Sequence, residues 1–591
     1  MRRPVVLRAG LWRRVLPMLA VVAVTAGCTA DPPPLAPPDQ GPVRSAPTPT
    51  REVVIGVDDL AGGFNPHTLA DLTPTSAAVA GLVLPSAFQQ AADGGWRLDT
   101  TLLSSAVVTG TDRFTITYRI RRDAAWSDGA PIAAEDFGYL AEQMRSGAGV
   151  VGSAGYQLID EVVSTDGGKT VRVVLRAPYP GWRTLFRHLL PAHLLKDAPG
   201  GWTDALDTGV PVSGGPFVLT SADPARRELV LSRNDRYWAA PALLDRLVLR
   251  QVSAADLVEA LGSGGMQAAL FGRPDAITTA LLAEAGISAP TVLPQPAVAH
   301  VLLRPSGAPL DDPRVRTAVA AALDRPALIA TGVGSGPSAD LVADAQILAP
   351  SRPGYTPTAP ATGPPVEPAP ETVRRLLTEV GYERGPGGWE LGGVPLELTV
   401  AAPANRDPYP TLAARVAAQL ADAGIGATVV TPPADELFET RLDDTGAGAP
   451  ERPSGTATTG DTGTQVPDDG DARIDIAVVP QPAGGDPATL LASAHGCPLV
   501  VPAGVPIAEP NTAGSCDVAL QPLIEEVLTG RTPLDTAAPV LEPALWDAVV
   551  SVPLYQHASL LVTTPVLRGV QPGALLEGPL AGAARWRISR R

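Results

Sequence analysis

The side chains that could carry out acid–base or metal chemistry in this sequence are few and widely separated. Histidines stand at positions 67, 188, 193, 300, 495 and 557. His188 and His193 are five residues apart around Pro191, which suits neither two ligands on one helix face nor an open zinc site. The sequence contains no nucleophile elbow, no phosphate-binding loop and no C-x-x-C motif. It therefore predicts no enzyme, no metal site and no cofactor.

The three cysteines indicate an exported protein, with one cysteine modified by a lipid and the other two joined in a disulfide. Cys28 follows Thr25-Ala-Gly, after five arginines and an apolar run, Val15 to Ala26, that is too short to span a bilayer. This order is similar to a lipobox and predicts a lipoprotein signal peptide over 1–27 with the lipid on Cys28. Thr25 stands where leucine is usual, and a plain secretory signal with a stray cysteine is the alternative. Cys497 and Cys516 are predicted to form a disulfide, which would stabilise the fold by roughly 3 kcal/mol.

Composition limits the classes of partner. The 591 residues have a formal net charge of −16, and residues 1–27 hold five of the 45 basic residues and no acidic ones, so residues 28–591 carry −21. Such a surface repels phosphate backbones, and we expect no nucleic-acid partner. The Pro-rich residues 28–50 and the low-complexity residues 444–470 are predicted to be a disordered linker and a disordered insertion.

The stretch from Phe114 to Leu140 is predicted to contain a strand, a turn and the start of a helix. Apolar and polar residues alternate from Phe114 to Arg121, which predicts a half-buried strand. Trp126-Ser-Asp-Gly129 predicts a tight turn, and Ala134-Glu-Asp136 predicts the start of a helix. The adjacent carboxylates Glu135 and Asp136 are most simply explained by stabilisation of the helix N-terminus.

Local patterns predict further elements. Asp312-Pro313 is a good helix start before an apolar face of Val315, Val319 and Leu323. A helix over 372–380 precedes a strand, a helix and a strand over 396–430, an order that implies a parallel pair with a right-handed crossover. Other strands are expected at 52–57, 171–175, 228–231, 246–252 and 474–479.

Three motifs are specific as a set: Trp126-Ser-Asp-Gly129 before its helix, Arg233-Asn-Asp-Arg-Tyr-Trp238, and Asp311-Asp-Pro-Arg-Val-Arg316 with its helix. Together they resemble the extracytoplasmic solute-binding proteins of family 5, the peptide/nickel-binding type. The resemblance implies an α/β fold of the periplasmic-binding-protein-like class II, three-lobed (cluster C), with discontinuous domains and mixed sheets. The implied lobes are I (51–95, 211–297 and 550–591), II (96–210) and III (298–549, including the insertion).

Further motifs, among them Gly63-Phe-Asn-Pro-His67, Leu82-Val-Leu-Pro-Ser-Ala-Phe88 and Gly496-Cys-Pro498, resemble one subgroup of this family. Its members are actinobacterial lipoproteins linked to cell-envelope glycolipid synthesis. The resemblance implies a role in channelling phosphatidylinositol mannosides towards lipoarabinomannan.

Candidate ligand-binding residues follow from where the family's cleft lies. Asn65 and His67 end a first-lobe loop, although turn formation and packing would equally explain them. Arg406 and Tyr409 follow a last-lobe strand, where a guanidinium and a ring could contact phosphate and sugar, although a solvated loop arginine is the commoner case. Gln481 could donate to hydroxyl groups.

One departure from the family bears on the ligand. Peptide binders commonly carry a Trp-x-Ala-Asp-Tyr-x-Asp-Pro motif, whose first Asp pairs with the free amine of the peptide. Aligning the motif on Asp486-Pro487 places Ala483 at that position. The loss of a charge-assisted bond worth about 1.5–3 kcal/mol disfavours ordinary peptide import.

The sequence thus predicts a lipid-anchored binding protein on the extracytoplasmic face of the cell membrane. We expect an amphipathic glycolipid, a mannosylated phosphoinositide, as ligand, with an envelope mannosyltransferase as a possible partner. One alternative is the binding subunit of an ABC importer for peptides or similar solutes, docking on a permease. The other is an interaction scaffold that binds no small ligand.

Overall fold

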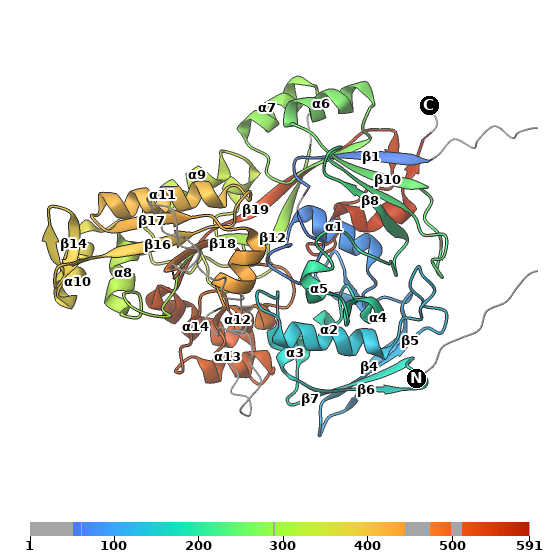
Figure 1. Ribbon diagram of the computed structural model, residues 1–591, viewed down its shortest axis with the longest axis horizontal. Helices are drawn as coiled ribbons and strands as arrows, with labels where there is room; N and C mark the ends of the chain where they lie inside the picture. Colours follow the sequence, from blue (N-terminus) through green and yellow to red (C-terminus); the bar gives the residue numbers. More distant parts are fainter. Residues whose placement is uncertain (1–50, 61, 288–289, 444–472, 498–510, 590–591) are drawn as a thin grey trace, which may run out of the picture. The chain divides into compact units, whose positions relative to one another are not determined.

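The computed structural model describes residues 51–60, 62–287, 290–443, 473–497 and 511–589. The predicted signal peptide over 1–27, the lipidation site Cys28, the linker over 28–50 and the insertion over 444–470 lie outside these residues. The boundaries of lobes I, II and III remain predictions. The elements below are labelled as in Figure 1.

A ten-stranded mixed sheet runs through the described part of the chain (Figure 1). Its order is β17-β16-β18-β12-β19-β11-β1-β10-β9-β8. The strands are β1 (Glu52–Val57), β8 (Phe217–Asp223), β9 (Glu228–Arg233), β10 (Arg246–Gln251), β11 (Ala268–Phe271), β12 (Thr291–Leu303), β16 (Glu397–Ala401), β17 (Gly426–Val430), β18 (Ile476–Pro482) and β19 (Ser551–Thr563). We call β8–β11 with β1 the β1 half, and β16–β18 the β16 half.

The central strands β12 and β19 join the two halves. Each is 13 residues long, and they pair antiparallel with each other. The start of β12 and the end of β19 lie beside the β1 half, where Leu270 of β11 pairs with Leu561. The end of β12 pairs with β18. In the pairing of β12 with β19, the register shifts between Pro294 and Val298. Within the described part of the chain, the sheet therefore passes from one half to the other through β12 and β19.

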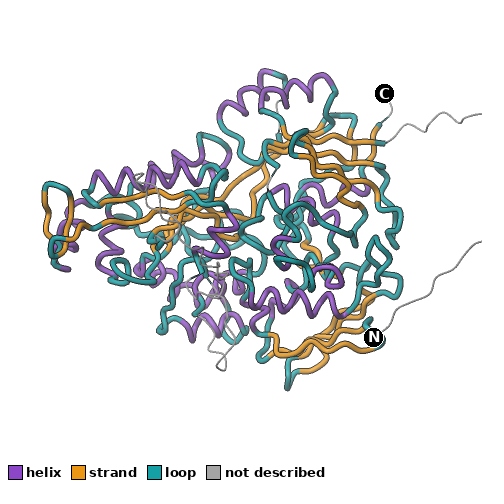
Figure 2. Tube along the Cα trace, viewed as in Figure 1, coloured by secondary structure: helices purple, strands orange, loops and turns teal. Residues whose placement is uncertain are grey.

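A separate four-stranded sheet has the order β4-β5-β7-β6 (Figure 2). Its strands are β4 (Leu103–Gly110), β5 (Thr115–Ile120), β6 (Ile159–Thr165) and β7 (Thr170–Leu175). The predicted strand is present as β5, but it is not half-buried. Thr115 and Thr117 are buried as well as the apolar face, because β5 lies between β4 and β7 and the Thr117 hydroxyl lies 2.9 Å from the Thr109 hydroxyl.

The turn and helix after β5 form as predicted. Gly129 takes a φ of 104°, a conformation that favours glycine. Helix α2 (Ala134–Ser146) begins where Asp136 accepts a hydrogen bond from Ala133 N at 2.9 Å. The Asp136 carboxylate also accepts from Ala192 N at 3.0 Å, so it holds two segments together. Burial raises the pKa of Asp136 to about 6, against the lowering effect of these hydrogen bonds.

Helices flank the β16 half, and α11 (Tyr409–Asp422) runs alongside β16 and β17 (Figure 1). The strands β16 and β17 are parallel, as the strand–helix–strand order predicts. Helix α8 (Pro313–Ala321) begins at Asp312, whose side chain accepts a hydrogen bond from Arg314 N, and α10 (Pro370–Val380) ends at Gly381. The predicted helix starts and the parallel pair are confirmed.

The remaining elements connect these layers. The helices are α1 (Pro74–Val83), α3 (Ala154–Gln157), α4 (Ala192–Leu195), α5 (Gly201–Asp204), α6 (Ala254–Ser263), α7 (Ala276–Glu284), α9 (Arg325–Val333), α12 (Pro487–His495), α13 (Gln521–Leu528) and α14 (Leu534–Ala548), with short helices η1 (Pro180–Thr184), η2 (Pro337–Asp340), η3 (Glu436–Arg441) and η5 (Pro579–Arg585). The short strands are β2 (Phe88–Gln90), β3 (Trp96–Leu98), β13 (Glu383–Gly385), β14 (Gly388–Leu391), β15 (Val394–Pro395), β20 (Leu567–Arg568) and β21 (Arg587–Ile588).

Candidate ligand-binding site

Three cavities lie around the crossing strands β12 and β19. The largest, about 510 Å³, is lined by α1, the β2–β3 turn, β12 and the segments 351–353 and 572–579; we call it the apolar cavity. A second, about 90 Å³, is lined by residues around Arg273, Arg406 and His557; we call it the polar cavity. A third, also about 90 Å³, lies beside Gln481 and Ala483; we call it the inner cavity. Of these three, the apolar cavity falls within the roughly 300–1,000 Å³ typical of small-molecule sites.

The polar cavity brings together Arg406 and Tyr409, two residues selected from the sequence. The Tyr409 hydroxyl lies 2.8 Å from Nε2 of His557. Burial lowers the pKa of His557 to about 4, with the charge of Arg273 adding to the effect, so this ring is neutral near pH 7. A neutral imidazole can accept the tyrosine's hydrogen bond, and together the two rings form an uncharged wall.

Arg406 connects the β16 half to the chain before α1. Its guanidinium donates to the carbonyl oxygens of Leu69, at 2.9 Å, and Ala70. Burial lowers the pKa of Arg406, while Tyr409 and nearby carboxylates oppose that shift. Arg406 therefore holds the two sides of the polar cavity together in this structure, a role that sequence reasoning did not foresee.

Charges of both signs occupy the opposite wall of the polar cavity. Asp58 accepts hydrogen bonds from Gly272 N at 2.8 Å and Arg273 N at 2.9 Å. The Arg273 guanidinium lies 3.8 Å from Asp59 and donates to the Asp407 carbonyl. Burial is the largest influence on Asp59 and raises its pKa, although Arg273 opposes this. The cavity thus presents carboxylates and guanidinium groups that can hydrogen-bond hydroxyl or phosphate oxygens.

The apolar cavity has a different chemistry. Among the described residues that line it, only Asp93, Arg352 and Glu577 carry a charge. Asp93 lies in an exposed turn, where it accepts from Gly95 N at 3.0 Å. Glu577 pairs with Arg187 at 3.3 Å, and both of these side chains are largely buried. Leucine, alanine and proline side chains supply much of the wall.

The apolar and polar cavities share part of their lining: Leu72, Thr73, Pro74, Leu270, Gln295 and Ala297 contribute to both. These residues come from the start of α1, from β11 and from the crossing strand β12. Since the same side chains border both spaces, the two cavities are adjacent. The combined site is amphipathic, with a large apolar end and a small polar end.

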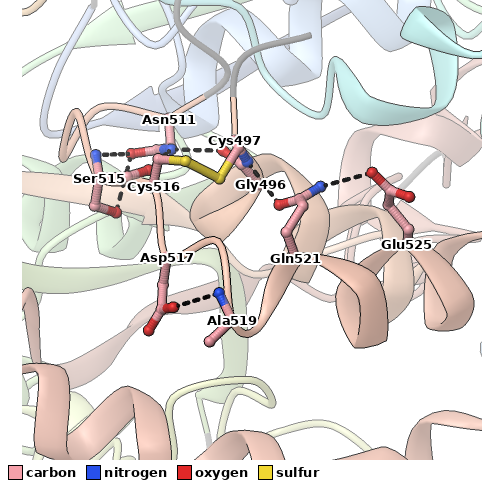
Figure 3. The surroundings of a disulfide bond; sticks show 9 residues. All are labelled: Gly496, Cys497, Asn511, Ser515, Cys516, Asp517, Ala519, Gln521 and Glu525. Carbon is pink, nitrogen blue, oxygen red and sulfur yellow. Dashed lines mark hydrogen bonds between the residues drawn. A yellow bond between two sulfur atoms is a disulfide. The ribbon is translucent and has the colours of Figure 1, made fainter.

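The inner cavity contains the remaining cleft residues considered from sequence. Gln481 donates to the Thr512 hydroxyl at 2.7 Å, and Ala483, only 6% exposed, lies in the lining. Residues 511–513 also line this cavity, and the disulfide between Cys497 and Cys516 closes the segment that contains them (Figure 3). The Asn511 side chain donates to the Gly496 and Ser515 carbonyls across that segment.

Asn65 and His67 are placed differently. Both are buried, and neither lines any of the three cavities. The His67 ring stacks on Trp202 with centroids 5.9 Å apart, and its Nε2 lies 2.9 Å from the His188 carbonyl oxygen. Burial lowers the pKa of His67 to about 4. These contacts correspond to the packing role that the sequence left open, and a ligand-binding role for either residue stays a prediction.

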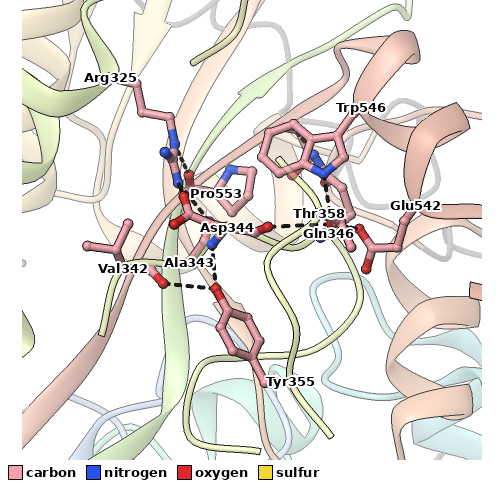
Figure 4. Close-up of polar contacts among 11 residues, drawn as sticks. Arg325, Val342, Ala343, Asp344, Gln346, Tyr355, Thr358, Glu542, Trp546 and Pro553 are labelled. Carbon is pink, nitrogen blue, oxygen red and sulfur yellow. Dashed lines mark hydrogen bonds and ion pairs between the residues drawn. The ribbon is translucent and has the colours of Figure 1, made fainter. Parts of the chain in front are cut away.

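The segment 341–358, which sequence reasoning missed, contributes to two of the cavities. Residues 346–349 line the inner cavity and residues 351–353 line the apolar cavity. The Glu542 carboxylate from α14 accepts hydrogen bonds from Gln346 N at 2.8 Å, Ile347 N at 3.0 Å and the Thr358 hydroxyl at 2.6 Å (Figure 4). Trp546 donates to the same hydroxyl at 3.1 Å. Buried bonds therefore fix this segment beside the cavities.

The other end of the same network holds Asp344. Arg325 donates to the Asp344 carboxylate at 2.9 Å and to the Ala343 carbonyl at 2.7 Å (Figure 4). The Tyr355 hydroxyl accepts from Asp344 N at 2.7 Å and donates to the Val342 carbonyl. No local pattern predicts the placement of this segment, because the residue that holds it, Glu542, is more than 180 residues away in the chain.

Within the described ranges, no group of three or more His, Cys, Asp or Glu side chains is arranged to hold a metal ion. Among the described helices, none has the length and apolar character needed to cross a bilayer.

Comparisons with known proteins agree with this geometry. The family model described as "Bacterial extracellular solute-binding proteins, family 5 Middle" matches residues 99–455. The chain is 35% identical over 95% of its length to a Mycobacterium tuberculosis protein named "Probable monoacyl phosphatidylinositol tetramannoside-binding protein LpqW", 96% of which is covered. It is 29% identical over 53% of its length to the oligopeptide-binding protein OppA of Mycobacterium tuberculosis, 56% of which is covered.

Solved structures share the fold. The oligopeptide-binding protein AppA of Bacillus subtilis, determined in complex with a nonapeptide, superposes with a TM-score of 0.68. The superposition covers 92% of this chain and 100% of that chain at 14% sequence identity. The predicted α/β, periplasmic-binding-protein-like class II fold with mixed sheets is confirmed.

Proposed function

The chain belongs to family 5 of the bacterial extracellular solute-binding proteins, and we propose that its ligand is an amphipathic glycolipid, a mannosylated phosphoinositide. In this proposal the protein takes part in cell-envelope glycolipid synthesis as a ligand-binding regulator. It acts on the extracytoplasmic face of the cell membrane, where a lipid on Cys28 anchors it.

The observation that carries the proposal is the shared wall of the apolar and polar cavities. A lipid with a sugar headgroup has the same division into an apolar and a polar part. In the polar cavity Asp59 can accept hydrogen bonds from sugar hydroxyls, and the Arg273 guanidinium can donate to hydroxyl and phosphate oxygens beside neutral His557. The apolar cavity, about 510 Å³, offers a largely uncharged wall to hydrocarbon.

Similarity to LpqW supports the same ligand class. That protein's name states binding of a monoacyl phosphatidylinositol tetramannoside, and the match spans nearly the full length of both chains. Since such lipids are made at the cell envelope, the proposed partner is an envelope mannosyltransferase whose supply or use of the lipid depends on the bound state.

Peptide import is the second candidate, and the relationship to OppA is the observation that favours it. Two features of the site oppose it. Ala483 leaves the inner cavity without a carboxylate at the position where peptide binders hold the free amine, and that cavity is only about 90 Å³. The same small volume is what a scaffold without a small ligand would show, so the scaffold is the third candidate.

A titration of the full chain separates the candidates. We expect purified monoacyl phosphatidylinositol tetramannoside to bind one molecule per protein, and the deacylated mannoside and a mixture of nonapeptides to bind far more weakly. Tight binding of peptides with no binding of the lipid would establish the importer. Binding of none of these ligands would exclude the glycolipid function and favour the scaffold.

A further inference from the structure

The polar side chains that line the apolar cavity are largely engaged by the protein itself. Gln295 Nε2 donates to the Gly272 carbonyl and lies 2.8 Å from the Ser559 hydroxyl. The Ser351 hydroxyl accepts from Gln556 Nε2 at 2.8 Å. Each of these groups already has a protein partner, which reduces what it can offer to the amides of a peptide or the hydroxyls of a sugar.

The same holds for the wall formed by the segment 572–579. Gln90 Oε1 accepts from Leu576 N at 3.0 Å, and the Glu577 carboxylate accepts from Gln90 N at 2.9 Å as well as from Arg187. A buried ligand group that needs hydrogen bonds would lose them in this cavity. The chemistry of the wall selects a hydrocarbon segment.

Arg352 is the exception in this wall. Its guanidinium donates to the Gly485 carbonyl at 2.9 Å, which uses one of its five N–H groups. Burial lowers the pKa of Arg352, and the nearby Asp486 carboxylate only partly offsets this. Asp486 itself accepts from the backbone and hydroxyl of Thr489 as the N-cap of α12. Arg352 is thus a half-buried cation with donors to spare beside an apolar space.

The volume suits one hydrocarbon chain. A methylene group takes roughly the 30 Å³ that a water molecule occupies in the liquid. The 510 Å³ of the cavity therefore holds on the order of 17 methylene groups. This is enough for one long acyl chain.

We propose that the apolar cavity holds one acyl chain of an anionic lipid and that Arg352 binds the phosphate of that lipid. The inference rests on the proposed function for the identity of the rest of the headgroup, which would extend into the polar cavity across the shared residues Leu72, Thr73 and Ala297. The placement of the acyl chain in the cavity and of the phosphate on Arg352 does not depend on which sugars the headgroup carries.

The test uses the full chain and four defined lipids. The probes are palmitoyl lysophosphatidylinositol, glycerophosphoinositol, dipalmitoyl phosphatidylinositol and monopalmitoylglycerol, each titrated by calorimetry below its micelle concentration or from a cyclodextrin complex. We expect one molecule of lysophosphatidylinositol to bind per protein. Glycerophosphoinositol should bind at least about 100-fold more weakly because it lacks the acyl chain. Equal affinity for lysophosphatidylinositol and glycerophosphoinositol, or failure of both acylated phosphoinositides to bind, would overturn the proposal.

Two cavity variants test whether the acyl chain of the lipid occupies the apolar cavity. Ala78→Trp fills the cavity from α1 and should weaken lysophosphatidylinositol by about 10-fold or more. Its control is Ala283→Trp, at an exposed position on α7 away from the cavity, which should bind like the wild type. Val292→Glu provides a second disruption that the fold tolerates, because Val292 is 49% exposed at the cavity. Wild-type affinity in both cavity variants, with intact circular dichroism, would exclude this cavity.

A charge series tests Arg352. Arg352→Gln should weaken lysophosphatidylinositol by about 10-fold and leave uncharged monopalmitoylglycerol unchanged, and Arg352→Lys should restore part of the loss. The matched control, Arg375→Gln, removes an exposed guanidinium that pairs with Glu379 on α10. An equal loss for the charged and the uncharged lipid would show that Arg352 acts only through packing.

The outcome distinguishes this inference from the proposed function. If the mannosylated lipid fails to bind while lysophosphatidylinositol binds through this cavity, the proposed function is wrong and the inference stands. If the mannosylated lipid binds the wild type and Ala78→Trp with equal affinity, the inference is wrong and the proposed function stands.

Discussion

Glu542 offers the sharpest test of how the cavity walls are held. This carboxylate is 5% exposed and accepts the backbone N–H groups of Gln346 and Ile347 together with the Thr358 hydroxyl. Glu542→Gln keeps the shape of the side chain but replaces one acceptor oxygen with an NH₂ group, which repels a backbone N–H. One charge-assisted bond is therefore lost, worth about 1.5–3 kcal/mol.

That loss can be measured as local opening of the segment 341–358. Because about 1.4 kcal/mol corresponds to a factor of ten, amide exchange at Gln346 and Ile347 should accelerate by roughly 10- to 160-fold. Hydrogen exchange with mass spectrometry, at a pH where exchange follows the opening equilibrium, reports this rate on peptides from the segment. Peptides from β5, in the separate four-stranded sheet, should exchange as in the wild type.

The control is Glu525→Gln on α13, which removes an exposed carboxylate that accepts a hydrogen bond from the side chain of Gln521. It should leave exchange over 341–358 unchanged. If Glu542→Gln also leaves that exchange unchanged, the Glu542 bonds do not hold the segment, and the argument that a fixed wall presents Arg352 to the apolar cavity would be refuted.

Three further predictions concern the anchor, a buried carboxyl and the disulfide. Cys28→Ser should move the protein from the membrane to the soluble fraction, and retention in the membrane would show that Cys28 carries no anchor. The pKa of Asp136 is raised by burial to about 6, so its contribution to the free energy of unfolding is fully present below about pH 4 and is lost as the pH rises through 6. Urea unfolding from pH 4 to pH 7 should therefore show a steeper loss of stability for the wild type than for Asp136→Asn, and parallel curves would contradict this. Replacing Cys497 and Cys516 together with alanine should lower the free energy of unfolding by about 3 kcal/mol under non-reducing conditions, and an unchanged urea midpoint would contradict the expected role of the crosslink.

Local signals in the sequence predicted the elements well. Strand β5, the Gly129 turn and the start of α8 at Asp312 depend on alternation, on a glycine conformation and on an N-cap, which act within a few residues. The burial of Thr117 did not follow from alternation, because it depends on which strands lie on either side of β5.

The site was predicted only in part for the same physical reason. Arg406 and Tyr409 do line a cavity, as their place after a last-lobe strand indicated. Arg352 gave no signal, since its position depends on the segment that Glu542 holds from 190 residues away. The hydrogen bond from Arg406 to the Leu69 carbonyl could not be predicted either, because it forms only once the chain before α1 lies against the β16 half.

Lipid analysis of the purified protein tests the central claim most directly. The full chain is expressed in an actinobacterial host, purified without added lipid, and its bound small molecules are extracted and identified by mass spectrometry. The account predicts one stoichiometric lipid with acyl chains, a phosphoinositol and mannose residues, and its loss in Ala78→Trp. A mixture of peptides, or a protein that carries no lipid and binds none on titration, would contradict it.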